Sequence, residues 1–210
     1  MNTATPSTPF TGVSHLAFIT RDLQATIRFY RDLLGLPLVI SMGERSSKHY
    51  FFQLTEHDVV AFFAWEDASP IAPKRPGVPT TAPRGFDHLA LGVRSKADLL
   101  ALTDRLEAAG IPFEGPIDHG LGWSVYFKDP NNIDLELTWS TVELHGPLLA
   151  DSDPLAAARE GSAPRADAWP LRAATSTQRA VRPGVGSELG AYVVQRGLGH
   201  WVDDAREDAP

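Results

Sequence analysis

The chain repeats one of its own segments, and this repeat constrains its fold more than any other feature. The segment Gly-Val-Ser-His15-Leu-Ala-Phe returns as Gly-Phe-Asp-His88-Leu-Ala-Leu, at an offset of 88 − 15 = 73 positions. Each copy runs into a stretch with apolar residues at three- and four-residue steps, over 23–34 and 96–109, which predicts a helix. Gly35 and Gly110 follow, each two positions before a proline, as expected where a helix ends.

Short apolar runs follow each predicted helix and indicate strands. They cover 38–42, 49–54 and 59–65 in the first copy, and 113–114, 124–127 and 133–139 in the second. One such unit is too small to bury both faces of its sheet, so two units are expected to pack together. The sequence therefore predicts an α+β fold of paired βαβββ modules that form a cupped, eight-stranded mixed sheet.

The rest of the chain differs from these two modules. Residues 67–84 lie within a proline-rich stretch that suits a semi-rigid linker, and residues 151–183 are crowded with small and polar residues without a period. Apolar residues in 189–202 could dock as a short element on the sheet or on a second subunit. The predicted division is a flexible N-terminus (1–9), a first module (10–66), the linker (67–84), a second module (85–142) and a disordered or loosely docked tail (143–210).

Composition excludes several classes of function. The formal net charge is −7 and no basic stripe is present, which argues against nucleic acid as a partner. No apolar run approaches the roughly 18–20 residues that cross a membrane, and the first residues do not resemble a signal peptide, so we expect a cytoplasmic protein. The chain has no cysteine, which removes thiolates as ligands or nucleophiles.

Three residues point to a metal site. His15 and His88 occupy the same place in the repeat, and Glu136 lies between leucines on a predicted last strand. Two imidazoles and one carboxylate on such strands can converge on one face of an octahedral ion and leave its other positions open. A lone histidine on an apolar strand is more often a core residue, but the repeat favours ligation here. A carboxylate buried among leucines also needs a compensating charge.

The duplicated pattern, with metal-binding residues on inward-facing strands, resembles the vicinal oxygen chelate superfamily. That superfamily includes glyoxalase I, extradiol dioxygenases and fosfomycin-modifying enzymes, and the resemblance covers roughly residues 10–142. Glyoxalase I and related epimerases have a fourth protein ligand in the first repeat. Shifting Glu136 back by 73 or 74 positions reaches Phe63 or Phe62, neither of which is a carboxylate. Three ligands leave room for substrate and dioxygen, which favours an oxygenase or a thiol transferase.

Three further segments are similar to extradiol catechol dioxygenases. The segment His57-Asp-Val-Val-Ala-Phe resembles the one whose histidine acts as acid and base, and Gly-Pro-Ile-Asp-His119-Gly resembles the one whose histidine approaches the substrate oxygen. Tyr126 lies ten residues before Glu136, as in that family, and Asn132 takes the place of the usual glycine in a left-handed turn. The resemblance thus implies catalytic roles for His57, His119 and Tyr126.

Aromatic side chains near these segments are interpreted as core or pocket-wall residues, and an aromatic wall would suit a flat ring. The candidates are Phe51, Phe63, Trp123 and Trp139.

The leading hypothesis is a non-haem Fe(II) extradiol-type dioxygenase that cleaves a small, catechol-like substrate and works as a homodimer. A redox-neutral metalloenzyme with Mn(II), Ni(II) or Zn(II) is the alternative, either a glyoxalase- or epimerase-like lyase or isomerase, or a fosfomycin-type thiol transferase. A non-catalytic drug-binding resistance protein is the third hypothesis. The sequence leaves the metal and the substrate open.

Overall fold

The computed structural model describes residues 12–44, 47–79, 81, 86–163 and 187–202. Its contacts divide the chain into two units, Met1–Glu143 and Leu144–Pro210, and each is described by itself. The predicted flexible N-terminus (1–9) lies outside the described residues. Residues 164–183, which are most of the stretch rich in small and polar residues, also lie outside them.

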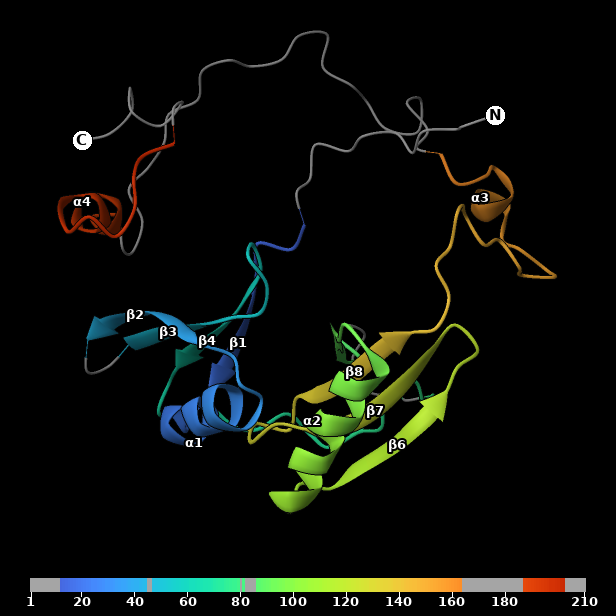
Figure 1. Cartoon of the computed structure of the whole chain (residues 1–210), viewed down its shortest axis with the longest axis horizontal. Coiled ribbons are helices and arrows are strands. Elements are labelled where there is room, and N and C mark those ends of the chain that lie inside the picture. The colour runs from blue at the N-terminus through green and yellow to red at the C-terminus, as the bar shows by residue number, and fades with distance from the viewer. Residues whose placement is uncertain (1–11, 45–46, 80, 82–85, 164–186, 203–210) are drawn as a thin grey trace, which may run out of the picture. The chain divides into compact units, whose positions relative to one another are not determined.

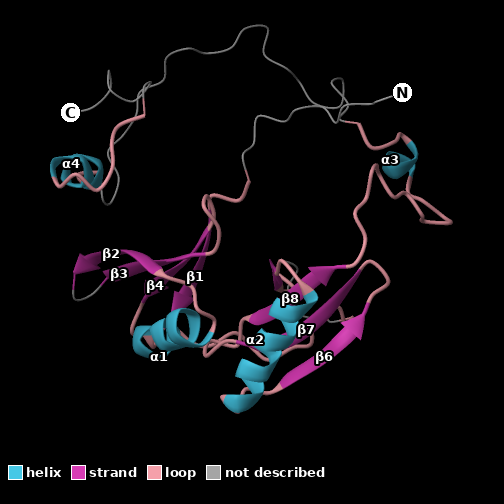
Figure 2. Ribbon diagram, viewed as in Figure 1, coloured by secondary structure: helices cyan, strands magenta, loops and turns pink. Residues whose placement is uncertain are grey.

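The first unit contains two βαβββ modules, as the repeat predicts (Figures 1 and 2). The elements of the first module are β1 (His15–Thr20), α1 (Leu23–Ile27), η1 (Arg28–Leu33), β2 (Leu38–Glu44), β3 (Ser47–Gln53) and β4 (Val59–Ala64). Those of the second module are β5 (Leu89–Gly92), α2 (Lys96–Ala108), β6 (Phe113–Asp118), β7 (Gly122–Lys128) and β8 (Asp134–Ser140).

The strands form two four-stranded mixed sheets with the same topology. The first sheet has the order β1-β4-β3-β2 and the second β5-β8-β7-β6. In each sheet the first and last strands of the module pair in parallel, and the other neighbours are antiparallel. The predicted α+β class and paired modules are confirmed, with the eight strands divided between two sheets.

The helices begin and end at the residues expected from the sequence. Asp22 accepts a hydrogen bond from the Ala25 backbone at the start of α1, and Ser95 does the same for Asp98 at the start of α2. From Arg28 the first helix continues as the wider π-helical turns of η1. Gly35 and Gly110 follow the two helices with φ of 80° and 68°, conformations that favour glycine.

One face of each sheet packs against its helix. Tyr30 of η1 is fully buried, with its ring 4.8 Å from Phe62 of β4 and 5.6 Å from Phe52 of β3. In the second module Leu99 and Leu106 of α2 are fully buried in the same hydrophobic core as the inward leucines of β8. Burial of each such side chain contributes about 1.5–3 kcal/mol. The helix of each module therefore covers one face of its sheet and leaves the opposite face uncovered by that helix.

A buried polar contact joins the two modules. The Tyr30 hydroxyl donates to Asp129 Oδ2 over 3.2 Å, at the turn between β7 and β8. Asp129 also accepts hydrogen bonds from the backbone of Asn131 and Ile133, and these hold the turn. Asn132 in this turn has φ of 61°, which confirms the left-handed conformation predicted for it.

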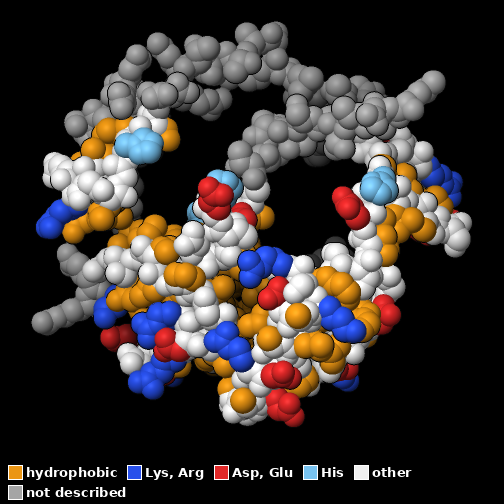
Figure 3. Space-filling view, in the orientation of Figure 1, with side chains coloured by type: hydrophobic (Ala, Val, Ile, Leu, Met, Phe, Trp, Pro, Cys, Tyr) orange, Lys and Arg blue, Asp and Glu red, His pale blue; other side chains and the backbone are white. Residues whose placement is uncertain are grey.

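The second unit contains two short helices, α3 (Ala156–Arg159) and α4 (Leu189–Gln195). The first part of the predicted apolar segment 189–202 thus forms a helix, and the Trp201 ring packs against it at Gly190. None of the helices in the described ranges is long and apolar enough to cross a membrane. On the face shown in Figure 3, acidic and basic side chains are interspersed rather than gathered by sign.

Candidate metal centre

Strand register places Glu136 on the face of the second sheet that turns away from α2. Glu136 pairs with Ala90 of β5 and Tyr126 of β7, so these three residues share one face. Its neighbours Leu135 and Leu137 point to the helix-covered face and are buried. We call the face with Ala90, Glu136 and Tyr126 the site face. Glu136 is only 7% exposed there, so its charge needs a partner.

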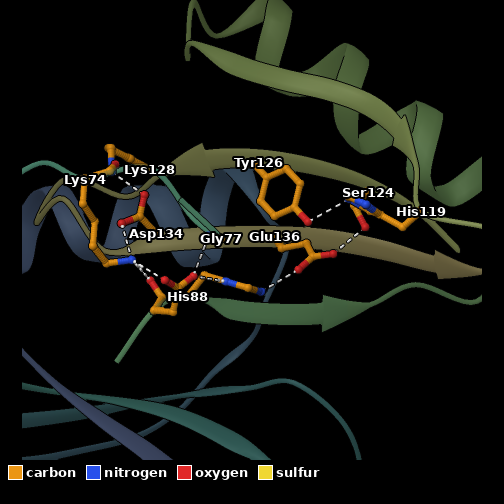
Figure 4. Close-up of polar contacts among 10 residues, drawn as sticks. Lys74, Gly77, His88, His119, Ser124, Tyr126, Lys128, Asp134 and Glu136 are labelled. Carbon is orange, nitrogen blue, oxygen red and sulfur yellow. Dashed lines mark hydrogen bonds and ion pairs between the residues drawn. The ribbon is translucent and has the colours of Figure 1, made fainter. Parts of the chain in front are cut away.

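His88, immediately before β5, provides that partner (Figure 4). His88 Nε2 lies 2.8 Å from Glu136 Oε2, and His88 Nδ1 lies 2.6 Å from Asp87 Oδ1. The imidazole is therefore held between two carboxylates. If Nδ1 donates its hydrogen to Asp87, Nε2 can face the Glu136 carboxylate only with a proton or a cation between them.

The pair fits a divalent metal ion. Ligands about 2.1 Å from an ion and at right angles to each other are about 3.0 Å apart, close to the observed separation of 2.8 Å. The contact with Asp87 leaves Nε2 as the donor atom of His88, as is usual for metal-binding histidines with a carboxylate behind them. His88 and Glu136 thus supply an imidazole and a carboxylate suited to Fe(II), Mn(II) or Zn(II).

Asp87, which contacts His88, is itself held by two residues of the linker. Lys74 Nζ lies 3.3 Å from Asp87 Oδ2 and 3.5 Å from Asp134 Oδ2, and the Gly77 backbone donates to Asp87 Oδ1 over 3.0 Å. Lys128 also donates to Asp134, which is buried. The hydrogen bond from His88, followed by the one from Gly77, lowers the pKa of Asp87 to about 2.

On its other side Glu136 is held by a hydrogen bond, and Tyr126 lies on the same face of the sheet. The Ser124 hydroxyl of β7 donates to Glu136 Oε1. The Tyr126 hydroxyl lies 3.0 Å from His119 Nε2, and the Tyr126 ring stands edge-on to His88 with centroids 5.9 Å apart. Burial, and then the charge of Glu136, raise the pKa of Tyr126, so its hydroxyl keeps its proton.

Two cavities lie near the second sheet. One of about 270 Å³ is bordered by Tyr126, Lys128 and Asp134 together with Lys74 of the linker. A larger one, of about 600 Å³, is lined by Leu91, Leu137 and residues of α2. Leu91 and Leu137 point away from the site face, whereas the smaller cavity includes Tyr126 of that face but is lined by neither His88 nor Glu136.

The third predicted ligand lies on the other sheet. His15 opens β1, is exposed, and has its Nδ1 atom 3.3 Å from the Ser14 hydroxyl. Within the described part of the chain no three histidine, aspartate or glutamate side chains gather closely enough to hold a metal ion. One chain thus brings His88 and Glu136 together and keeps His15 apart from them.

The predicted aromatic residues divide between opposite environments. Phe51 and Phe63 share the face of the first sheet that carries His15, which we call the aromatic face and which also includes His49 and Ala61. The Phe51 ring lies 6.4 Å from the His15 ring. Trp123 and Trp139 pair with each other on the helix-covered face of the second sheet, opposite Glu136. They pack against the core, because alternate residues of a strand point to opposite faces.

His57 lies on the turn between β3 and β4. Its side chain is 73% exposed, and its Nε2 atom is 4.0 Å from Glu56 Oε2. The turn is held by the Thr55 hydroxyl, which donates to Asp58 and accepts from the His57 backbone. A catalytic role for His57 stays a prediction.

Register also corrects the alignment of the repeats. Two residues after His15, Ala17 pairs with Ala61, just as Ala90, two after His88, pairs with Glu136. The counterpart of Glu136 is therefore Ala61, at an offset of 136 − 61 = 75, and not Phe62 or Phe63. The extra two positions lie between the first strand and the end of the helix, because Gly35 and Gly110 already differ by 110 − 35 = 75. The absence of a carboxylate at this position holds.

Sequence reasoning missed the residues that support the ligands. Asp87 was visible within the repeat, since Ser14 and Asp87 each precede a histidine and each contact its Nδ1 atom. Ser124 could have been inferred from its spacing of two from Tyr126, which puts it on the same face. The contacts of Lys74 could not be predicted from its place in the linker, because only the folded chain brings it to Asp87 and Asp134.

The element order and strand pairing define a domain of two βαβββ modules, with His88 and Glu136 as its candidate metal ligands. The family model of the Glyoxalase/Bleomycin resistance protein/Dioxygenase superfamily matches residues 12–137, and the chain belongs to that superfamily. It is 28% identical over 127 residues to biphenyl-2,3-diol 1,2-dioxygenase 3 of Rhodococcus globerulus. The match covers 60% of this chain and 61% of that protein, so the chain spans about three fifths of its length.

Two further comparisons agree with this assignment. The chain is 26% identical to lactoylglutathione lyase of Pseudomonas putida, over 66% of this chain and 90% of that protein. The crystal structure of a glyoxylase/bleomycin resistance protein/dioxygenase domain from Frankia sp. EAN1pec is 26% identical with a TM-score of 0.53, and covers 62% of this chain and 98% of that one.

Proposed function

We propose that this protein is a metal-dependent dioxygenase of the extradiol type, which acts on a small aromatic substrate with two adjacent hydroxyl groups. The observation that carries the proposal is the His88 and Glu136 pair, 2.8 Å apart, combined with Ala61 where a fourth ligand would lie. A three-ligand site leaves positions for two substrate oxygens and dioxygen.

The site is completed in a homodimer, with His15 supplied by a second copy of the chain. Two observations support this assembly. His15 is exposed and is not grouped with His88 and Glu136 in its own chain, while the repeat makes it the counterpart of His88. The aromatic face also carries Ile19, which is 47% exposed, and an uncovered apolar sheet face favours association.

His15, His88 and Glu136 would hold the metal ion, most suitably Fe(II). When bound, such an ion would acidify the substrate hydroxyls and give dioxygen access to electrons of the ring. Asp87 holds the His88 ring in the orientation that presents Nε2 to the ion. The Tyr126 hydroxyl hydrogen-bonds a substrate oxygen, and His119, 3.0 Å from Tyr126, accepts the proton that the substrate loses.

The similarity to the Rhodococcus dioxygenase supports the oxygenase, since that protein is named for its action on a biphenyl-2,3-diol. A redox-neutral lyase is the second candidate, because the similarity to the Pseudomonas lyase covers 90% of that protein. The two differ in their need for oxygen. A lyase stays active under strict anaerobiosis, and a dioxygenase does not.

Oxygen uptake tests the proposal. The protein is purified anaerobically, loaded with one equivalent of Fe(II), and mixed with a panel of catechols in an oxygen-electrode cell. We expect uptake matched by a ring-cleavage chromophore, abolished in Glu136→Ala and retained in Glu107→Ala, a control on the exposed surface of α2. Turnover without oxygen would refute the dioxygenase and support the lyase.

A further inference from the structure

One buried polar atom in the first sheet has no partner. His49 Nε2 is a buried side-chain nitrogen that makes no hydrogen bond to the described residues. Buried polar groups in folded proteins are nearly always hydrogen-bonded, and an unpaired one is destabilising. This nitrogen can therefore pair with a polar group that the described residues do not supply.

His49 lies on the aromatic face, beside the third predicted metal ligand. It pairs with Phe63 of β4, and its ring stacks on the Phe63 ring with centroids 3.6 Å apart and planes inclined by 15°. The Phe51 ring is 4.2 Å from His49 on one side and 6.4 Å from His15 on the other. Both histidines thus border the same aromatic floor.

The repeat shows what the corresponding position does in the second module. His49 is opposite Phe63, two residues beyond Ala61, and Ser124 is opposite Thr138, two residues beyond Glu136. His49 is therefore the counterpart of Ser124, again at an offset of 124 − 49 = 75. Ser124 hydrogen-bonds Glu136, whereas His49 has only Ala61 in the equivalent place. Without a carboxylate at this position, the His49 nitrogen lacks the partner that Ser124 has.

The ring can present this nitrogen to a ligand. His49 is only partly buried as a residue, and rotation about the bond to its ring is broad and nearly two-fold, so its two edges can exchange. A neutral imidazole ring offers one acceptor and one donor nitrogen.

We propose that His49 is a ligand-binding residue of the completed site, whose Nε2 atom hydrogen-bonds a polar oxygen of a flat ring seated against Phe51 and Phe63. This inference rests on the proposed function, because it requires the aromatic face to meet the site face of the second copy. His49 then fixes the orientation of the ring, while a metal ion held by His15, His88 and Glu136 would bind its two adjacent oxygens.

Binding of 4-nitrocatechol under anaerobic conditions tests this role without turnover. The Fe(II)-loaded protein is titrated and the Kd is read from the absorbance of the bound catecholate. We expect His49→Phe, which keeps the aromatic stack and removes the nitrogen, to raise the Kd about five- to tenfold. His49→Gln retains a hydrogen-bonding group and should raise it less, while His145→Phe in the second unit should leave it unchanged.

Two further measurements distinguish a role of His49 in ligand binding from a role in packing. Iron stoichiometry should stay the same in His49→Phe, because His49 contacts the ring and not the metal. Its melting temperature should equal or exceed that of the wild type, since a buried nitrogen without a partner is removed.

Each contrary result has a definite meaning. An unchanged Kd in His49→Phe overturns the role of His49 and leaves the proposed function intact. Loss of iron in that variant overturns it too, because His49 would then be a metal ligand. Failure of the loaded wild type to bind 4-nitrocatechol refutes the aromatic-diol substrate, and the role of His49 with it.

Discussion

Mixing two inactive variants tests whether the metal centre is built from two subunits. In the proposed dimer, one site contains His88 and Glu136 of one chain and His15 of the other. His15→Ala and Glu136→Ala each remove a ligand from both sites of their own homodimer. In a mixed dimer, however, one site regains all three ligands and the other lacks two.

The size of the rescue follows from this arrangement. Random pairing of equal amounts makes about half of the dimers mixed, and each has one complete site out of two. About one quarter of the sites should therefore bind iron tightly and turn over substrate. If instead each chain closed its own site, every chain in the mixture would still lack a ligand, and the expected rescue would be none.

The assay uses subunits exchanged by joint unfolding and refolding, with oxygen uptake and bound iron measured per chain. Light scattering confirms that each variant is a dimer, and unmixed variants treated in the same way supply the baseline. Activity and iron that stay at this baseline in verified mixed dimers would refute the shared site. A monomeric wild type would refute it as well.

Three other predictions concern the support of the site and the joint between modules. Asp87→Asn should weaken metal binding about 10- to 100-fold, measured by calorimetry, because a neutral amide orients His88 less strongly. The pKa of Asp87 is lowered from 3.8 to about 2, so the stability that its ionised form contributes is present above pH 3.8 and is lost as the pH falls through about 2. The difference in urea unfolding between wild type and Asp87→Asn should therefore shrink over that range, and a difference independent of pH would contradict it. Tyr30→Phe should lower the free energy of unfolding by about 1–3 kcal/mol, because Asp129 loses a buried hydrogen bond. An unchanged midpoint of urea unfolding would show that this contact does not stabilise the packing of the two modules.

Much of the fold could be predicted because it depends on local signals. Apolar spacing and the glycines after each helix located both helices, and the repeat of His15 at His88 revealed two equal modules. The weakest prediction was β6, which extends to Asp118 although only 113–114 read as a strand. Few of its residues are apolar, so its sequence does not predict a strand of this length. The strand forms because its backbone hydrogen-bonds to β7.

The candidate site was harder to predict for a geometric reason. The sequence left Trp123 and Trp139 as core or pocket-wall residues, and their register turns them toward the helix-covered face, where they pack against the core. His49 read as an ordinary strand residue, and only its surroundings show a nitrogen without a partner. Whether a side chain faces a site or the core depends on strand parity and on pairing across the sheet.

The sequence by itself determined the duplicated module and the equivalence of His15 and His88, since both follow from residue identity and spacing. It also showed that 59–65 contains no carboxylate, while the strand register identified Ala61 as the counterpart of Glu136. The tertiary structure alone decided that His88 meets Glu136 and Asp87, that Lys74 closes on Asp87 and Asp134, and that His15 lies apart on the other sheet. These contacts join residues far apart in the chain, and their distances depend on how the sheets and the linker pack rather than on any local pattern.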